Sequence, residues 1–225
     1  IVAVGGGSSI DTAKGISIVM TNPDRADIVS LNGASNTVNR GMPVIALPTT
    51  SGTAAEVTIN YVITDEEREV KMVCVDPHDI PIMAIVDSDL MATMPKSLAS
   101  ATGMDALTHA IEAYTATCSE PIADAVSLYA IELIYNNLKT AVFEGDNLQA
   151  RSAMLMGSML AGMGFSHSDV ASVHCISEAL GGMFDLAHGV CNAILLPHVM
   201  EYNKDYCVSK YARVAKAMGF EFKSD

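Results

Sequence analysis

The most constraining feature of the sequence is the stretch GMDALTHAIEAY at residues 103–114, which places a carboxylate and an imidazole side by side. Apolar residues recur there at helical spacing, and no glycine or proline interrupts the run after Gly103. Asp105 and His109 are four residues apart, so they project from one face of the same turn. By itself such a pair is more often a surface ion pair or a helix cap. A metal site therefore requires further ligands from another part of the chain.

Two more histidines are candidates for the other half of such a site. His174 lies in an apolar run of helical periodicity, where an unpartnered imidazole would be costly to bury. His188 follows a Gly-Gly pair, a position typical of a helix end or a turn. Taken singly, His174 is explained as a core histidine with its hydrogen bonds satisfied, and His188 as a turn residue. Together with Asp105 and His109 they form a donor set suited to Fe²⁺ or Zn²⁺, with room for a substrate oxygen.

Composition and charge exclude several classes of protein. Half of the 225 residues are hydrophobic and only 17% are charged, which excludes disorder and allows one or two domains. The net charge of −13 argues against nucleic-acid binding, which needs a basic face. The apolar runs are short and interrupted, so we expect no membrane partner. The five cysteines form no close pairs, which indicates reduced thiols in a cytoplasmic protein.

The beginning of the chain has the pattern of a phosphate-binding turn. An apolar strand at residues 1–4 leads into the segment GGGSSID at residues 5–11, and a helical pattern runs from Thr12 to about Met20. Free backbone N–H groups and the helix dipole at such a turn attract an anion. The glycine triplet is neither a dinucleotide fingerprint nor a P-loop, so a tight structural turn explains it at least as well.

A second candidate loop follows the apolar strand at residues 43–48. Its sequence, TTSGTAAE at residues 49–56, is rich in hydroxyls. Ligands of open α/β sheets bind at the carboxyl ends of strands, although hydroxyls that cap a helix are the alternative. Residues 57–75 alternate around an acidic turn and predict a β-hairpin, whose return strand carries Lys71. Lys71 could reach a ligand, although a solvated lysine is the ordinary expectation. A third strand is predicted at residues 80–86.

From residue 96 onward the pattern is helical throughout. Helical periods lie near residues 97–117, 121–143, 147–165, 168–181, 189–202 and 205–218. The breaks between them fall at Pro121, Gly145, the Gly162/Gly164 pair, Gly181-Gly182 and Tyr202-Asn203. We therefore predict an α/β part at residues 1–95 and an all-helical part at residues 96–225. The metal-type residues lie in the second part and the phosphate-type signals in the first, so a cleft between the two would hold cofactor and substrate.

These segments resemble the iron-containing (group III) alcohol dehydrogenases over essentially all 225 residues. The resemblance runs through residues 5–11, 48–58, 103–109 and 188–200, which are long and specific blocks. It implies an incomplete Rossmann-like dinucleotide-binding domain at residues 1–95 and a helical metal-binding catalytic domain at residues 96–225 that lacks its C-terminal part. Because members of the family are longer at both ends, we expect the chain to be an internal fragment.

The resemblance also implies roles for individual residues. It makes Asp105, His109, His174 and His188 the catalytic metal ligands, for Fe²⁺ or alternatively Zn²⁺. It implies contacts with the cofactor, NAD or NADP, from the following residues: Gly6, Gly7, Ser8, Asp11, Thr49, Thr50, Thr53, Val62, Lys71 and Leu90. One departure is Glu178, which stands where many relatives carry a second histidine, four residues after the ligand that corresponds to His174.

The resulting hypothesis is reversible NAD(P)-linked alcohol oxidation and aldehyde reduction. The metal would act as a Lewis acid on the substrate oxygen, and hydride would pass to or from the nicotinamide. Residues 57–67 are particularly similar to family members that act on lactaldehyde and 1,2-propanediol, which indicates a short-chain alcohol or aldehyde as partner. The alternatives are another metal-dependent member of the fold, such as a glycerol dehydrogenase, and a non-catalytic scaffold. We further expect a homo-oligomer.

Overall fold

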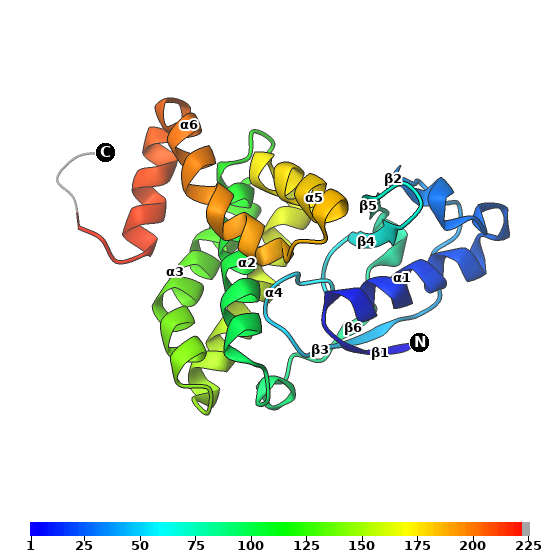
Figure 1. Ribbon diagram of the computed structural model, residues 1–225, viewed down its shortest axis with the longest axis horizontal. Helices are drawn as coiled ribbons and strands as arrows, with labels where there is room; N and C mark the ends of the chain where they lie inside the picture. Colours follow the sequence, from blue (N-terminus) through cyan, green and yellow to red (C-terminus); the bar gives the residue numbers. More distant parts are fainter. Residues whose placement is uncertain (222–225) are drawn as a thin grey trace.

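The computed structural model describes residues 1–221, in which strands and long helices occupy separate stretches of the chain (Figure 1). All described strands lie between Val2 and Ala84, and the helices α2 to α6 lie between Lys96 and Ala217. The first stretch holds one α-helix and several short 3-10 turns. Among the described residues, no helix has the length and apolar character needed to cross a membrane. The predicted fold class, α/β followed by all-helical, is confirmed.

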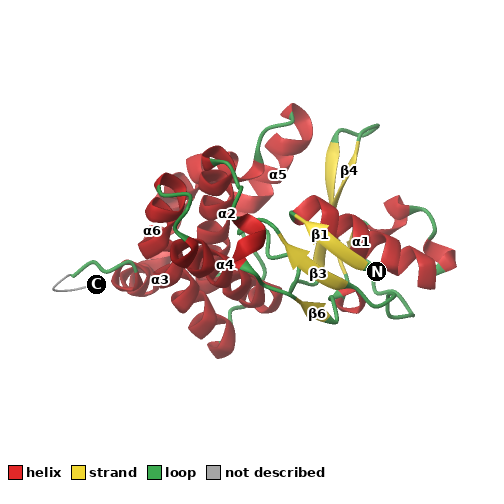
Figure 2. Ribbon diagram, turned by 90° about the horizontal axis from the view of Figure 1, so that it is seen from below, coloured by secondary structure: helices red, strands yellow, loops and turns green. Residues whose placement is uncertain are grey.

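The first sheet brings the two candidate phosphate loops to one edge (Figure 2). Its parallel strands are β1 (Val2–Gly5), β3 (Ile45–Pro48) and β6 (Met83–Ala84), in the order β1-β3-β6. Gly5 pairs with Pro48, so β1 and β3 end side by side. The glycine-rich turn and the loop at residues 49–56 therefore leave the sheet together, at the edge where α/β folds bind ligands.

The second sheet contains the predicted hairpin. Strands β4 (Asn60–Asp65) and β5 (Val70–Val75) pair antiparallel, which confirms the prediction. A two-residue strand absent from the prediction, β2 (Gly33–Ala34), runs parallel to β5. Inward-facing side chains of the hairpin form a small core with α1 and a preceding turn; its buried members are Ile18, Leu31, Tyr61, Met72 and Cys74. The hairpin is thus fixed against α1.

Helix α1 (Gly7–Thr21) begins five residues earlier than its apolar pattern predicts. The glycine-rich segment forms the first turn of this helix, so its free N–H groups lie at the sheet edge. A Cβ added to Gly7 would lie 2.7 Å from Cγ2 of Thr53, so a glycine is required where the two loops meet. Buried Lys14 donates to the carbonyls of Thr58 at 2.7 Å and Asn60 at 2.6 Å, which ties α1 to the hairpin.

The helical part is organised around α2 (Figure 1). The helices are α2 (Lys96–Thr115), α3 (Pro121–Phe143), α4 (Leu148–Ser168), α5 (Ser172–Phe184) and α6 (His188–Ala217). Helix α2 packs against α3, α4 and α6. Its residues Ala106, Ala110, Ile111 and Tyr114 are at most 2% exposed and belong to the main core. This burial fixes the orientation of the helix that carries Asp105.

Two predicted breaks are wrong because their glycines lie inside helices. Gly162 and Gly164 are in α4, and Gly181-Gly182 is in α5. A Cβ on Gly162 would lie 2.3 Å from the Cβ of Ala54, and one on Gly182 would lie 2.9 Å from the carbonyl oxygen of Glu69. These glycines permit close approach between helices and the α/β part, so they mark contacts rather than helix ends.

Two other boundaries also differ from the prediction. The break at Tyr202-Asn203 is wrong, because α6 continues through it and only kinks at Cys207, where φ is −121°. The strand predicted at residues 80–86 is reduced to β6, because Pro81 lacks an N–H and 3-10 turns lie on both sides.

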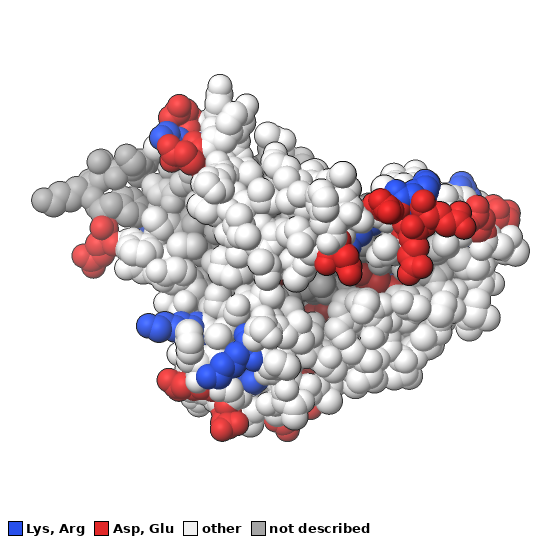
Figure 3. Space-filling view, viewed as in Figure 1, with Lys and Arg blue, Asp and Glu red and all other residues white. Residues whose placement is uncertain are grey.

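On the face in Figure 3 the basic side chains form small separate groups, and acidic side chains gather over the α/β part.

Candidate functional site

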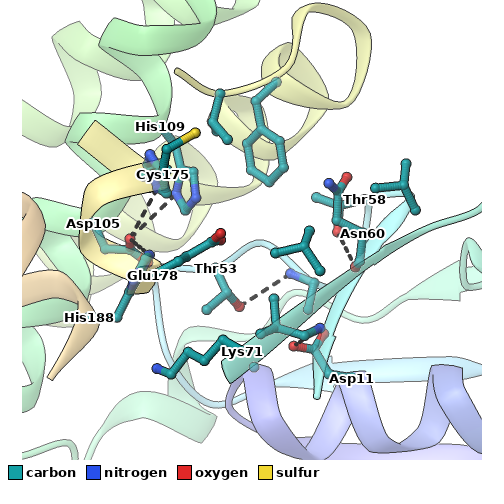
Figure 4. A pocket seen from close by; sticks show the side chains of 18 of the residues that line it. Asp11, Thr53, Thr58, Asn60, Lys71, Asp105, His109, Cys175, Glu178 and His188 are labelled. Atoms are coloured by element: carbon teal, nitrogen blue, oxygen red, sulfur yellow. Dashed lines mark hydrogen bonds and ion pairs between the residues drawn. The ribbon is translucent and has the colours of Figure 1, made fainter. Parts of the chain in front are cut away.

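Four side chains converge from three helices that are distant in sequence. Asp105 and His109 come from α2, and His188 is the first residue of α6 (Figure 4). His174 comes from α5. One ligand atom each from Asp105, His109 and His174 lie within 4.8 Å of one another. His188 Nε2 lies 3.4 Å from Asp105 Oδ1, and His174 Nε2 lies 3.7 Å from the same oxygen. The structure brings together all four residues that the sequence put forward.

The cluster is buried, and burial sets its protonation. Burial would raise the pKa of Asp105, but the surrounding imidazoles hold it well below its usual range. Burial lowers the pKa of His109 to about 3 and also lowers that of His188. Burial opposes charge on His174, yet its hydrogen bonds to carboxylates raise its pKa to about 9. The ionised Asp105 carboxylate and the neutral imidazoles of His109 and His188 are in the state that binds metal ions, and His174 must give up its extra proton to bind one.

The rings of the cluster are held in place by stacking and hydrogen bonds. His109 stacks between Phe165, at 4.5 Å between ring centroids, and His174, at 4.3 Å. The Ser177 hydroxyl lies 2.9 Å from His188 Nδ1, which leaves Nε2 of that ring facing Asp105. The site is therefore preorganised by contacts outside the four side chains themselves.

Asn192 is a site residue that the sequence analysis missed. It lies one turn after His188 on α6 and is fully buried. Its amide nitrogen donates to Asp105 Oδ1 at 2.8 Å and lies 3.3 Å from His174 Nε2 and 3.2 Å from His188 Nε2. The four-residue spacing from His188, the same as that between Asp105 and His109, was the available signal.

The cluster lines a cavity of about 560 Å³ whose other walls come from the α/β part and from further residues of α4, α5 and the turn between them. Residues expected to contact a cofactor line this cavity: Gly7, Ser8, Asp11, Thr53, Val62 and Lys71. Asp11 and Val62 contact each other, because the Val62 N–H donates to Asp11 Oδ2 at 3.1 Å. Burial raises the pKa of Asp11 to about 6. Glu178 also lines the cavity, one turn after His174.

Four other expected cofactor residues are not among the cavity-lining side chains: Gly6, Thr49, Thr50 and Leu90. Gly6 lies against Thr50, since an added Cβ would lie 3.3 Å from its hydroxyl oxygen. The Thr49 N–H donates to the Gly5 carbonyl at 2.9 Å, at the same sheet edge. Leu90 lies in a 3-10 turn and is 37% exposed. The structure thus groups the first three at the edge of the sheet, and the role of Leu90 stays a prediction.

Comparison with known families decides to which one this arrangement belongs. The family described as Fe-containing alcohol dehydrogenase, C-terminal, matches residues 99–225, and iron-containing alcohol dehydrogenase matches residues 1–88. The chain belongs to the iron-containing alcohol dehydrogenase family. The predicted resemblance is confirmed, and membership of this family implies a metal and a nicotinamide cofactor.

Individual members of the iron-containing alcohol dehydrogenase family are similar along nearly the whole chain. Lactaldehyde reductase of Escherichia coli (strain K12) is 51% identical over 219 residues, 97% of this chain and 57% of that enzyme. The 1,3-propanediol dehydrogenase of Klebsiella pneumoniae is 46% identical and covers 97% of this chain and 56% of its own length. The structure of alcohol dehydrogenase from Oenococcus oeni gives a TM-score of 0.94 at 44% identity, covering 98% of this chain and 57% of that one. This family member therefore spans a little over half the length of these relatives.

Proposed function

We propose that the chain carries the metal centre and dinucleotide cleft of an NAD-linked dehydrogenase that interconverts short-chain alcohols and aldehydes of the lactaldehyde/1,2-propanediol type. The observation that carries the proposal is the convergence of Asp105, His109, His174 and His188 at the end of a cavity that the glycine-rich turn also lines. The substrate class is supported by two similar proteins, which are named for their action on lactaldehyde and on 1,3-propanediol.

The donor set fits an iron or zinc ion. One carboxylate and three imidazoles suit both cations. His109 Nδ1 is buried and has no hydrogen-bond partner among the described residues, and a buried polar atom of this kind calls for a ligand. We take Fe²⁺ as the occupant and Zn²⁺ as its competitor. When bound, the cation supplies Lewis-acid polarisation of the substrate oxygen.

The glycine-rich turn and the loop at residues 49–56 fit the pyrophosphate of a dinucleotide. The first turn of α1 offers free N–H groups and the positive end of the helix dipole. Lys71 is the single Lys or Arg among the described residues that line the cavity. We take NAD as the cofactor and NADP as its competitor. Once bound, the cofactor supplies or accepts the hydride.

The remaining lining residues set the polarity of the cavity and hold a proton. Val62, Val73 and Phe165 present apolar surface, which excludes water from the reacting atoms. Glu178 lines the same cavity, and burial raises the pKa of its carboxyl. We assign it the exchange of the substrate's proton with solvent. In this proposal residues 1–95 act as the cofactor unit and residues 96–225 as the metal unit.

The test is binding by the full 225-residue chain. After chelation, Fe²⁺ or Zn²⁺ is added back, the bound metal per chain is measured, and NADH is titrated calorimetrically. We expect one cation per chain and saturable NADH binding, with NADH consumption on lactaldehyde only in the metal-loaded form. A chain that binds neither metal nor NADH would contradict the proposal and favour a scaffold, and metal-independent turnover would contradict the role of the cation.

A further inference from the structure

We propose that Glu112 is a positioning residue of the metal centre, which fixes the orientation and tautomer of His174 so that Nε2 faces the cation. The inference rests on the proposed metal centre. It gives a role to a carboxylate that lies within the stretch at residues 103–114 but is not one of the four expected ligands.

Glu112 holds the far side of the His174 ring. It lies seven residues after Asp105 on α2, hence on the same face, and is 3% exposed. Its Oε2 lies 2.5 Å from His174 Nδ1, while Nε2 of that ring lies 3.7 Å from Asp105 Oδ1. A carboxylate only accepts hydrogen bonds, so Nδ1 must carry the proton. Nε2 is then the nitrogen with a free lone pair for a cation.

The same carboxylate fixes the helix that carries His174. It accepts the backbone N–H groups of Ala171 at 3.1 Å and Val173 at 2.8 Å, at the start of α5. No side chain of α5 caps this end itself. Glu112 therefore caps α5 from another helix, and a negative charge at that helix end is favourable. Ring and helix are positioned by one group, which leaves His174 little freedom to turn.

Chemistry explains why this acceptor is a carboxylate. Three donors converge on two oxygens: two backbone N–H groups and the imidazole Nδ1–H. A glutamine of the same shape has one oxygen for the helix cap and presents an NH₂ group to the ring. Facing that donor, His174 would accept at Nδ1 and carry its proton on Nε2, where it can no longer bind a cation.

The experiment compares E112Q with wild type in the full chain. Affinity for Zn²⁺ is measured by competition with a chromophoric chelator. The His174 tautomer is measured by long-range ¹H–¹⁵N NMR of the metal-free chain above pH 9, where the ring is neutral. The matched control is E56Q, which removes another buried carboxylate whose charged neighbour is Lys14 and none of the ligands. We expect a loss of about 10–100-fold in Zn²⁺ affinity for E112Q and no loss for E56Q. The proton of His174 should move from Nδ1 to Nε2.

The outcomes separate this inference from the proposed function. Wild-type affinity in a folded E112Q, with Nδ1 still protonated, would overturn the role of Glu112 and leave the metal centre intact. Absence of Zn²⁺ binding in wild type would overturn the metal centre and the inference with it. If E112Q does not fold, the wild-type spectrum decides, since a His174 ring protonated only at Nε2 contradicts the proposal.

Discussion

Two buried clusters of charge in this molecule make opposite use of burial. Around Asp105 on α2, imidazoles surround one carboxylate at the end of a cavity, and they hold the pKa of that carboxyl below its usual range. Around Lys14 on α1, burial raises the pKa of Asp79 and Glu56 to about 7. The ammonium lies 3.4 Å from Asp79 and bonds to backbone carbonyls.

The difference lies in what each cluster leaves open. In the Lys14 cluster the lysine ammonium occupies the centre. Its hydrogen bonds go to backbone carbonyls beside the hairpin, so they hold α1 in place. In the Asp105 cluster no cation of the chain, among the described residues, occupies the centre; imidazole nitrogens and one carboxylate gather at the end of an open cavity. Buried charge is thus structural in the Lys14 cluster and available to a ligand in the Asp105 cluster. The predictions that follow test this contrast, from the largest expected effect to the smallest.

The largest effect is expected from K14M in the structural cluster. Removing the ammonium leaves Asp79 buried without its partner, so we expect a loss of about 3–5 kcal/mol in the free energy of unfolding. Denaturant titration measures it, and the double variant K14M/D79N should recover part of the loss. An unchanged midpoint for K14M would show that the pair contributes nothing to the fold.

D105N tests the other cluster. The amide keeps the shape but removes the charge that attracts a cation, so we expect at least a 100-fold loss of Zn²⁺ affinity, about 2.7 kcal/mol. Competition titration measures it, with D146N at an exposed carboxylate of the helical part as control. Equal affinities for D105N, D146N and wild type would place the cation elsewhere.

The pH dependence of E56Q sharpens the contrast. Because burial raises the pKa of Glu56 from 4.5 to about 7, folding is penalised once the pH exceeds the unfolded value. The penalty grows as pH rises from 4.5 toward 7 and is complete above it. E56Q should therefore be more stable than wild type by up to about 2 kcal/mol at pH 8, and this gain should vanish near pH 4.5. Chemical denaturation at several pH values tests this, and a gain independent of pH would contradict it.

The smallest effect is expected from N192A. The Asn192 amide contacts three of the four ligand side chains, so its removal should loosen their spacing and lower Zn²⁺ affinity about 10-fold. C191A, a truncation at the neighbouring buried position on α6, serves as control. If both variants bind Zn²⁺ like wild type, Asn192 is a packing residue only.

Much of this architecture was predictable because it depends on local pattern. Helical spacing placed Asp105 and His109 on one face, and the placement of His188 at a helix end is confirmed, although the Gly-Gly pair before it lies inside α5. Close packing between distant segments could not be predicted in this way. Gly162 and Gly182 lie within helices, and the need for glycine there is seen only in the folded chain, where they pack against Ala54 and the hairpin backbone. Residues that position a metal-binding side chain cannot be predicted for the same reason, because their contacts are distant in sequence. Glu112 sits in a plain amphipathic helix, and nothing local shows that it faces the start of α5 from 59 residues away.

X-ray absorption at the metal edge of the chain loaded with Fe²⁺ or Zn²⁺ tests the central claim most directly. The account predicts a first shell of nitrogen and oxygen at about 2.0–2.2 Å, with the outer-shell scattering of three imidazoles. That imidazole scattering should drop in H188A. Sulfur in the first shell, or a spectrum without imidazole scattering, would contradict a cation held by Asp105, His109, His174 and His188.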